Sequence, residues 1–143
     1  MVGGLLVLAL GLLLWIAIQD LRTRMIPDAL TIPFIVACLL HAIARWQVDV
    51  VAILFLTITL GFQWLVSRGT WVGSGDVFLA LGLGLLLPSW QAAVTLLAVA
   101  YIAAGIVAAI LLLTRRVTRG SHLPFAPFLA LGTFVALLFP PLL

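Results

Sequence analysis

The chain has 143 residues, of which 66% are hydrophobic and only 8% are charged. A soluble domain of this size needs far more polar surface, so the composition excludes that class and indicates a polytopic membrane protein. The sequence contains no lysine and no glutamate, and its net charge of +3 comes from seven arginines and four aspartates. This balance suits loops that face anionic lipid headgroups and gives no sign of nucleic-acid binding.

The apolar segments predict one domain, residues 1–143, folded as an all-α bundle of six transmembrane helices. The first segment is expected to be retained as a helix, because it lacks the basic start and the small-residue cleavage site of a signal peptide. Cys38 is the only cysteine, which excludes an internal disulfide, and we expect it to be buried or lipid-facing. The predicted helices are residues 2–19, 28–45, 50–66, 76–87, 90–113 and 124–138.

The fourth predicted helix is unusually short. It would be only about 18 Å long, against about 30 Å of hydrocarbon. Either the helix begins earlier, near Thr70, or a broken segment leaves Asp76 below the membrane surface. Both alternatives place Asp76 in a recess, because irregular backbone at that depth must line a cavity or be buried in protein. Several glycines suit close helix packing, namely Gly82, Gly84, Gly105 and Gly132.

The arginines predict the orientation. Six of the seven follow the first, third and fifth predicted helices, and only Arg45 lies on the opposite side. By the positive-inside rule the arginine-rich side faces the cytoplasm and both termini face outward. Asp20 and Asp76 then lie at the same, cytoplasmic end. We expect Arg115, Arg116 and Arg119 to act as topology determinants at the headgroups.

The remaining polar and aromatic residues suggest structural roles. His41 and His122 are expected to be structural or interfacial, with His122 the better functional candidate because it lies on the cytoplasmic side. Trp46, Trp71 and Trp90 suit anchoring at the lipid headgroups.

Asp20 and Asp76 are the candidate catalytic residues. A carboxylate within or at the edge of a membrane is costly and marks a functional site by default. Two close carboxylates hold one proton between them, so one deprotonates water for attack on an amide while the other polarises the carbonyl and protonates the leaving nitrogen. This chemistry needs no metal, cofactor or covalent nucleophile. Gly73 and Gly75, just before Asp76, permit positive φ and close approach of an extended peptide.

Hydrolysis by serine, cysteine or zinc is poorly supported. The two histidines are far apart in the sequence, and no cluster of histidines and cysteines exists. No serine has a nucleophile elbow or a nearby lysine.

Three motifs in order resemble those of the type IV prepilin peptidases, membrane aspartyl proteases of the Gly-x-Gly-Asp class. The first contains Asp20, Ile26, Pro27, Asp28, Leu30, Thr31 and Pro33, the second is Gly73-Ser74-Gly75-Asp76 followed by Leu79-Ala80-Leu81-Gly82, and the third is residues 123–132. The resemblance implies that Asp20 and Asp76 are the catalytic pair. It also implies substrate-binding or motif-supporting roles for Ile26, Pro27, Asp28, Gly73, Ser74, Gly75, Pro124, Phe125 and Pro127.

The resemblance further implies a substrate class and a location. Substrates would be prepilin-like precursors with a short basic leader before a hydrophobic helix, cut on the cytoplasmic side of the bacterial inner membrane for type IV pili or protein secretion. Partners would be these proteins and membrane lipids, with no cofactor, no metal and no nucleic acid.

Two features differ from many relatives. Phe78 occupies a position where they carry lysine, which removes one cation near Asp76. The chain has a single cysteine where larger relatives have a cytoplasmic domain with paired Cys-x-x-Cys motifs. We therefore expect a short, peptidase-only form and doubt methyltransferase activity.

Other readings stay open. A non-enzymatic cation transporter would use the aspartates as ligands or relays, with mid-span polar residues along its path: Cys38, Thr57, Thr59, Gln63 and Thr95. A catalytically lapsed assembly scaffold is the third functional reading. Each aspartate also has a simpler role: Asp20 as ion-pair partner of Arg22 or Arg24, Asp76 as an N-cap, Asp28 as an N-cap or substrate contact, and Asp49 as a solvated loop charge near Arg45.

Overall fold

The computed structural model describes residues 2–116 and 123–139, and every regular element in these ranges is an α-helix. The all-α prediction is confirmed. The six helices of the described residues are α1 (Val2–Thr23), α2 (Asp28–Arg45), α3 (Val50–Ser67), α4 (Ser74–Leu86), α5 (Trp90–Leu113) and α6 (Ala126–Leu138).

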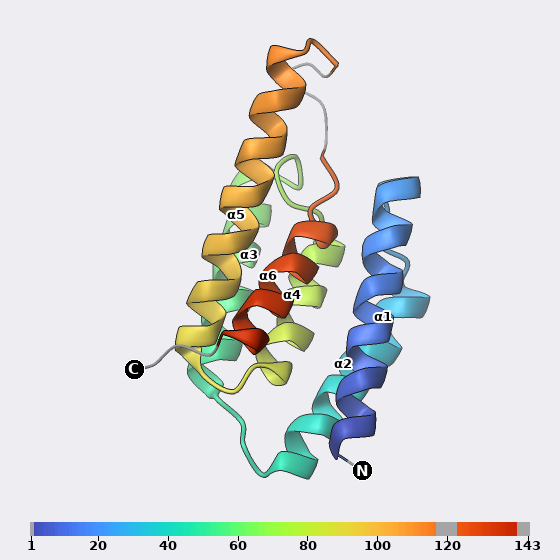
Figure 1. Ribbon diagram of the computed structural model, residues 1–143, viewed down its shortest axis with the longest axis vertical. Coiled ribbons are helices and arrows are strands. Elements are labelled where there is room, and N and C mark those ends of the chain that lie inside the picture. The colour runs from blue at the N-terminus through green and yellow to red at the C-terminus, as the bar shows by residue number, and fades with distance from the viewer. Residues whose placement is uncertain (1, 117–122, 140–143) are drawn as a thin grey trace.

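Four of these helices, α1, α2, α3 and α5, are long and apolar enough to cross a membrane, with 18 to 24 residues each. The other two, α4 and α6, are apolar but have only 13 residues each, a length of about 20 Å. They lie between the α1–α2 pair and the α3–α5 pair (Figure 1). The short helices therefore occupy the interior of the bundle, and their N-termini begin below the tip of α5 (Figure 1).

The helices contact one another in a closed ring, in the order α1, α2, α4, α3, α5, α6 and back to α1. The chain runs up and down, so the connections after α1, α3 and α5 gather at one end of the bundle, away from the N-terminus (Figure 1). The described arginines of that end are Arg22, Arg24, Arg68, Arg115 and Arg116, while Arg45 lies at the other end. Arg119 lies outside the described residues.

Left-handed residues terminate four of the helices. Arg24, Trp46, Arg68 and Arg115 follow α1, α2, α3 and α5 with φ between 51° and 54°. A residue in this conformation turns the chain out of the helix and lets its last carbonyls find donors. Three of these four residues are arginines of the same end, so the charges there also mark helix ends.

Three helix boundaries differ from the sequence prediction by two residues or more. α1 continues one turn further, to Thr23, so Asp20 lies inside the helix and not beyond its end. α4 begins at Ser74, which rules out a helical start near Thr70. α6 begins at Ala126 and not at Pro124. The chain before α4 is therefore not helical, and Asp76 lies in the first turn of a short interior helix. This is the second of the two alternatives that the sequence left open for this segment.

Three of the four glycines predicted to support packing do so, because a Cβ on each would meet another helix. Gly82 faces the Phe34 ring, Gly84 the backbone of Ile53, and Gly132 the backbone of Leu96. The prediction for Gly105 is wrong, because no atom lies within 4 Å of the position where its Cβ would stand.

The expected roles of Asp28 and Asp49 are reversed. Pro27, not Asp28, is the N-cap of α2, and no side chain caps this helix. Asp49 is the N-cap of α3: its Oδ1 accepts hydrogen bonds from the N–H groups of Val51 at 2.9 Å and Ala52 at 3.1 Å. Its Oδ2 accepts a hydrogen bond from the backbone N–H of Trp90 at 2.7 Å, which links α3 to the start of α5. Asp49 is therefore a structural link and not a solvated loop charge.

Two further side chains are buried in the bundle. Cys38 is fully buried in the apolar core. His41 is also buried, and its Nδ1 lies 3.1 Å from the carbonyl oxygen of Val2, which suits the expected structural role. His122 lies outside the described residues.

Candidate active site

Asp76 is placed by the start of α4. Gly73 is the N-cap of this helix, so Asp76 stands at the N3 position and the reading of Asp76 as an N-cap is wrong. Its Oδ2 accepts a hydrogen bond from Gly73 N–H at 3.2 Å, the side-chain half of a capping box. The residue is 6% exposed. Its other oxygen, Oδ1, is buried and has no hydrogen-bond partner among the described residues.

Asp20 is held from the opposite side of the bundle. It lies in the last turns of α1 and is 5% exposed. Its Oδ2 accepts a hydrogen bond of 3.1 Å from the backbone N–H of Ala126, the first residue of α6 and 106 positions away in the sequence. No arginine of the described residues forms an ion pair with it, so pairing with Arg22 or Arg24 does not explain its burial.

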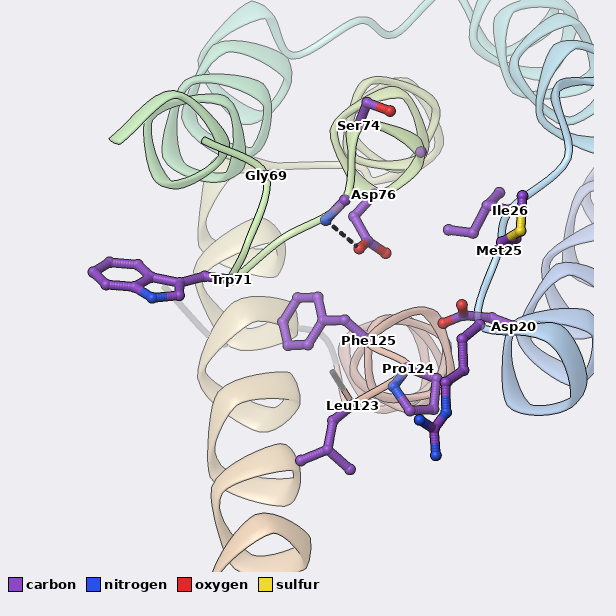
Figure 2. A pocket seen from close by; sticks show the side chains of 13 residues that line it. Asp20, Met25, Ile26, Gly69, Trp71, Ser74, Asp76, Leu123, Pro124 and Phe125 are labelled. Carbon is purple, nitrogen blue, oxygen red and sulfur yellow. Dashed lines mark hydrogen bonds between the residues drawn. The ribbon is translucent and has the colours of Figure 1, made fainter. Parts of the chain in front are cut away.

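The two carboxylates border one cavity of about 310 Å³. Figure 2 shows Asp20 and Asp76 extending toward the same space from α1 and α4, with Phe125 beside it. They are also close enough to interact electrostatically. The cavity is lined by Asp20, Arg24, Met25, Ile26, Gly69, Trp71, Gly73, Ser74, Gly75, Asp76, Leu123, Pro124 and Phe125.

Most of the predicted supporting residues line this cavity. They are Ile26, Gly73, Ser74, Gly75, Pro124 and Phe125. Pro27, Asp28 and Pro127 are not among the lining residues. Asp28 is exposed, and the two prolines lie at the starts of α2 and α6. The two prolines therefore contribute to the starts of these helices and not to the cavity wall.

Gly75 joins the first motif to the second. A Cβ at this position would lie 2.8 Å from Cβ of Ile26, a separation that real Cβ atoms do not reach. The absent side chain thus accommodates Ile26, the residue before Pro27. The expected positive φ is not found: Gly73 has φ of −75°, and Gly75 is not among the glycines with positive φ.

Several lining residues were not predicted from the sequence. Arg24 and Met25 lie between two residues of the first motif, Gly69 and Trp71 precede the second, and Leu123 opens the third. Trp71 was assigned only to headgroup anchoring; it is 70% exposed and also borders the cavity. These residues are adjacent in the sequence to the motifs, and that adjacency was the signal that could have found them, because the segments next to the motifs turn around the two carboxylates.

Position 78 lies away from the carboxylates. Phe78 is 53% exposed and does not line the cavity, although it follows Asp76 by two residues on α4. The substitution of phenylalanine for lysine therefore changes the outer surface of α4 and leaves the lining of the cavity intact.

Two buried carboxylates beside one cavity can hold a proton between them, accept a second one from water and return it to a leaving group. Together with the apolar helices, this site defines a multi-pass membrane protein with a paired acidic centre. The chain belongs to the type IV leader peptidase family, whose family model matches residues 7–113, more than half of the chain.

The family match confirms the resemblance seen in the sequence and implies a peptidase that acts on prepilin-like proteins. The matched residues include both aspartates, while the segment 123–132 lies outside them. No curated protein matches the chain, and no solved structure does.

Proposed function

We propose that this protein is an aspartic endopeptidase that cleaves the leader of prepilin-like precursors, with Asp20 and Asp76 as the catalytic pair. One observation carries the proposal: the Oδ1 atom of Asp76 is buried without a hydrogen-bond partner beside a cavity that Asp20 also borders. A buried polar atom left unpaired costs about 1–3 kcal/mol. Substrate or water in the cavity offers the missing partner.

The proposed reaction needs only the pair and one water. One carboxylate takes a proton from water, and the water oxygen bonds to the carbonyl carbon of the scissile amide. The other, protonated carboxyl stabilises the oxyanion and then gives its proton to the leaving nitrogen as the C–N bond breaks. Transfer of a proton between the two aspartates restores the starting state.

The proposed location is the bacterial inner membrane, with the cavity at the cytoplasmic face and both termini outward. The cavity lies at the same end of the bundle as five of the six described arginines, which the positive-inside rule assigns to the cytoplasm. Precursors for type IV pili or for secretion present their leaders on that side. Methyltransferase activity is not part of this proposal.

Replacing either carboxylate tests the mechanism. Asp20→Asn and Asp76→Asn keep the size of the side chain but cannot accept and return a proton. Each should lower the rate of prepilin cleavage in proteoliposomes by about 10²- to 10⁴-fold or more, while the purified protein keeps its helical content. Asp28→Asn is the matched control, because this exposed residue does not line the cavity, and it should cleave normally.

Normal cleavage by either site variant contradicts the proposed pair. The same proteoliposomes separate the competing readings. A transporter predicts a cation flux that both site variants lose, and a lapsed scaffold predicts no cleavage by the unaltered protein.

A further inference from the structure

The two carboxylates have unequal surroundings. Asp20 receives the backbone N–H of Ala126 at 3.1 Å. Asp76 receives only the N–H of Gly73, and its Oδ1 has no donor among the described residues. Donors stabilise the ionised form of a carboxylate, whereas a buried oxygen without one favours the protonated form.

The start of α6 leaves one strong donor for Asp20. Phe125 is the N-cap of this helix and has no side-chain acceptor. Pro127, at the second helical position, has no N–H to leave unpaired, and the N–H of Phe128 is bonded to the carbonyl of Phe125 at 3.0 Å. The Ala126 N–H therefore lacks a partner within the helix, and the carboxylate of Asp20 caps it from α1.

This donor is held firmly. Ala126 is completely buried, and the Phe125 ring packs on Tyr101 of α5 and on Phe128, with centroid distances of 5.4 Å and 6.5 Å. The packing fixes the first turn of α6 against α5. Movement of the N–H away from Asp20 would require the loss of these aromatic contacts.

Few other ionisable groups surround the pair in the described part of the chain. Arg24, from the connection after α1, is the only other ionisable side chain that lines the cavity in the described part of the chain. Tyr101 of α5 lies within electrostatic range of Asp76, and a tyrosine phenol is uncharged at physiological pH. No cation lies on α4, whose acidic first-turn residue is Asp76 itself.

We propose that Asp20 carries the charge of the pair and takes the proton from water, that Asp76 holds the shared proton on Oδ1 and protonates the leaving nitrogen, and that the Ala126 N–H positions Asp20 for this task. Proton transfer from water to Asp20 accompanies formation of the bond between the water oxygen and the carbonyl carbon. Proton transfer from Asp76 accompanies cleavage of the C–N bond. The chemical roles rest on the proposed function, whereas the site of the resting proton does not.

Infrared spectroscopy of the protein in lipid nanodiscs, without substrate, locates that proton. The protonated-carboxyl band is followed against pH in Asp20→Asn, where Asp76 remains, and in Asp76→Asn, where Asp20 remains. The band should persist to a pH about one unit or more higher in Asp20→Asn, since the Ala126 N–H stabilises the ionised form of Asp20 and Asp76 lacks an equivalent donor on Oδ1. An equal or reversed order overturns the assignment.

A backbone ester tests the positioning role of Ala126. Lactic acid in place of Ala126 removes this N–H and leaves the side chain unchanged. The acidic limb of the kcat/KM profile should move up by about one pH unit or more, with little change in KM. The matched control is the same ester at Ala130, a buried alanine one turn further along α6, which should leave the limb in place.

An acidic limb that stays in place in the Ala126 ester, or that moves equally in both esters, overturns the positioning role. Failure of this inference is distinct from failure of the proposed function. If the unaltered protein does not cleave prepilin, the proposed function fails, but the infrared order still decides which carboxyl holds the proton.

Discussion

At the scale of single residues, the site depends on a side chain that is missing. Gly75 allows Ile26 to lie against the first turn of α4, so the segment after Asp20 and the helix of Asp76 meet at this contact. A side chain here would separate two motifs that lie about fifty residues apart in the sequence. Gly75 is therefore needed because it lets the segments that carry the two carboxylates approach each other, and not because its own backbone requires a glycine conformation.

Gly75→Ala should lower both cleavage and thermal stability. The added methyl group would lie 2.8 Å from Cβ of Ile26, and overpacking of this kind costs about 1–3 kcal/mol. Gly105→Ala is the control, because its Cβ would meet no atom and alanine is the better helix former by about 0.5–1 kcal/mol. The measurements are thermal unfolding in detergent and initial cleavage rates. Equal behaviour of the two variants would refute the steric role.

At the scale of elements, helix ends carry the specific contacts of this apolar chain. Asp20 caps α6 across the bundle, Asp76 completes the capping box of α4, and Asp49 caps α3 while holding the start of α5. Because N–H groups at a helix start have no partners within the helix, a carboxylate placed there gains hydrogen bonds and a favourable dipole. Three of the four acidic residues are used in this way.

Asp49→Ala should destabilise the bundle without changing the candidate active site. It removes acceptors from Val51, Ala52 and Trp90, and loss of an N-cap costs about 0.5–2 kcal/mol. Asp49→Asn, which keeps one acceptor oxygen, should fall between Ala and the unaltered protein. The readout is the melting temperature in detergent, together with cleavage per folded molecule, which should be unchanged because Asp49 lies at the opposite end of the bundle.

The matched control for this series is Asp28→Ala. Asp28 is exposed and caps nothing, so its loss should cost no more than the dipole contribution of about 0.3–1 kcal/mol. A larger destabilisation by Asp28→Ala than by Asp49→Ala would contradict the assignment of the two aspartates.

At the scale of the whole molecule, the ring of helices brings the first and the last helix, α1 and α6, side by side at the site. α6 packs against α1 as well as α5, and the site end carries most of the described arginines. The orientation proposed for the membrane therefore decides which compartment reaches the cavity. It also decides where a substrate leader must be presented.

Single cysteines at the two ends test this orientation. Gln47→Cys lies in the connection between α2 and α3, and Thr70→Cys lies near the cavity between α3 and α4; both positions are exposed. In intact cells a membrane-impermeant maleimide should label only Gln47→Cys, and Thr70→Cys should react after permeabilisation. The native Cys38 is fully buried and serves as the unreactive background. The opposite labelling pattern would place the cavity on the outer side.

Several features could be predicted from the sequence because they depend on local composition. Apolar length gives the helices, with α2 and α5 predicted at their observed boundaries. The sequence motifs predicted that Asp20 and Asp76 lie at one site, and both residues line the same cavity. The end of α1 and the starts of α4 and α6 were predicted at the wrong residues. A helix boundary depends on which partners the terminal N–H and carbonyl groups find.

What the sequence determined by itself is the membrane class, the all-α fold and the family, since apolar content, helix length and motif order are properties of the chain alone. The tertiary structure alone decided the long-range partners of the carboxylates. Asp49 caps α3 through the nearby Val51 and Ala52, but it also binds Trp90 only because α5 starts beside α3. Asp20 meets Ala126 only after α6 returns to α1. Hydrogen bonds between residues 106 positions apart leave no periodic pattern, because they depend on how the helices pack and not on the spacing of residues within any one helix.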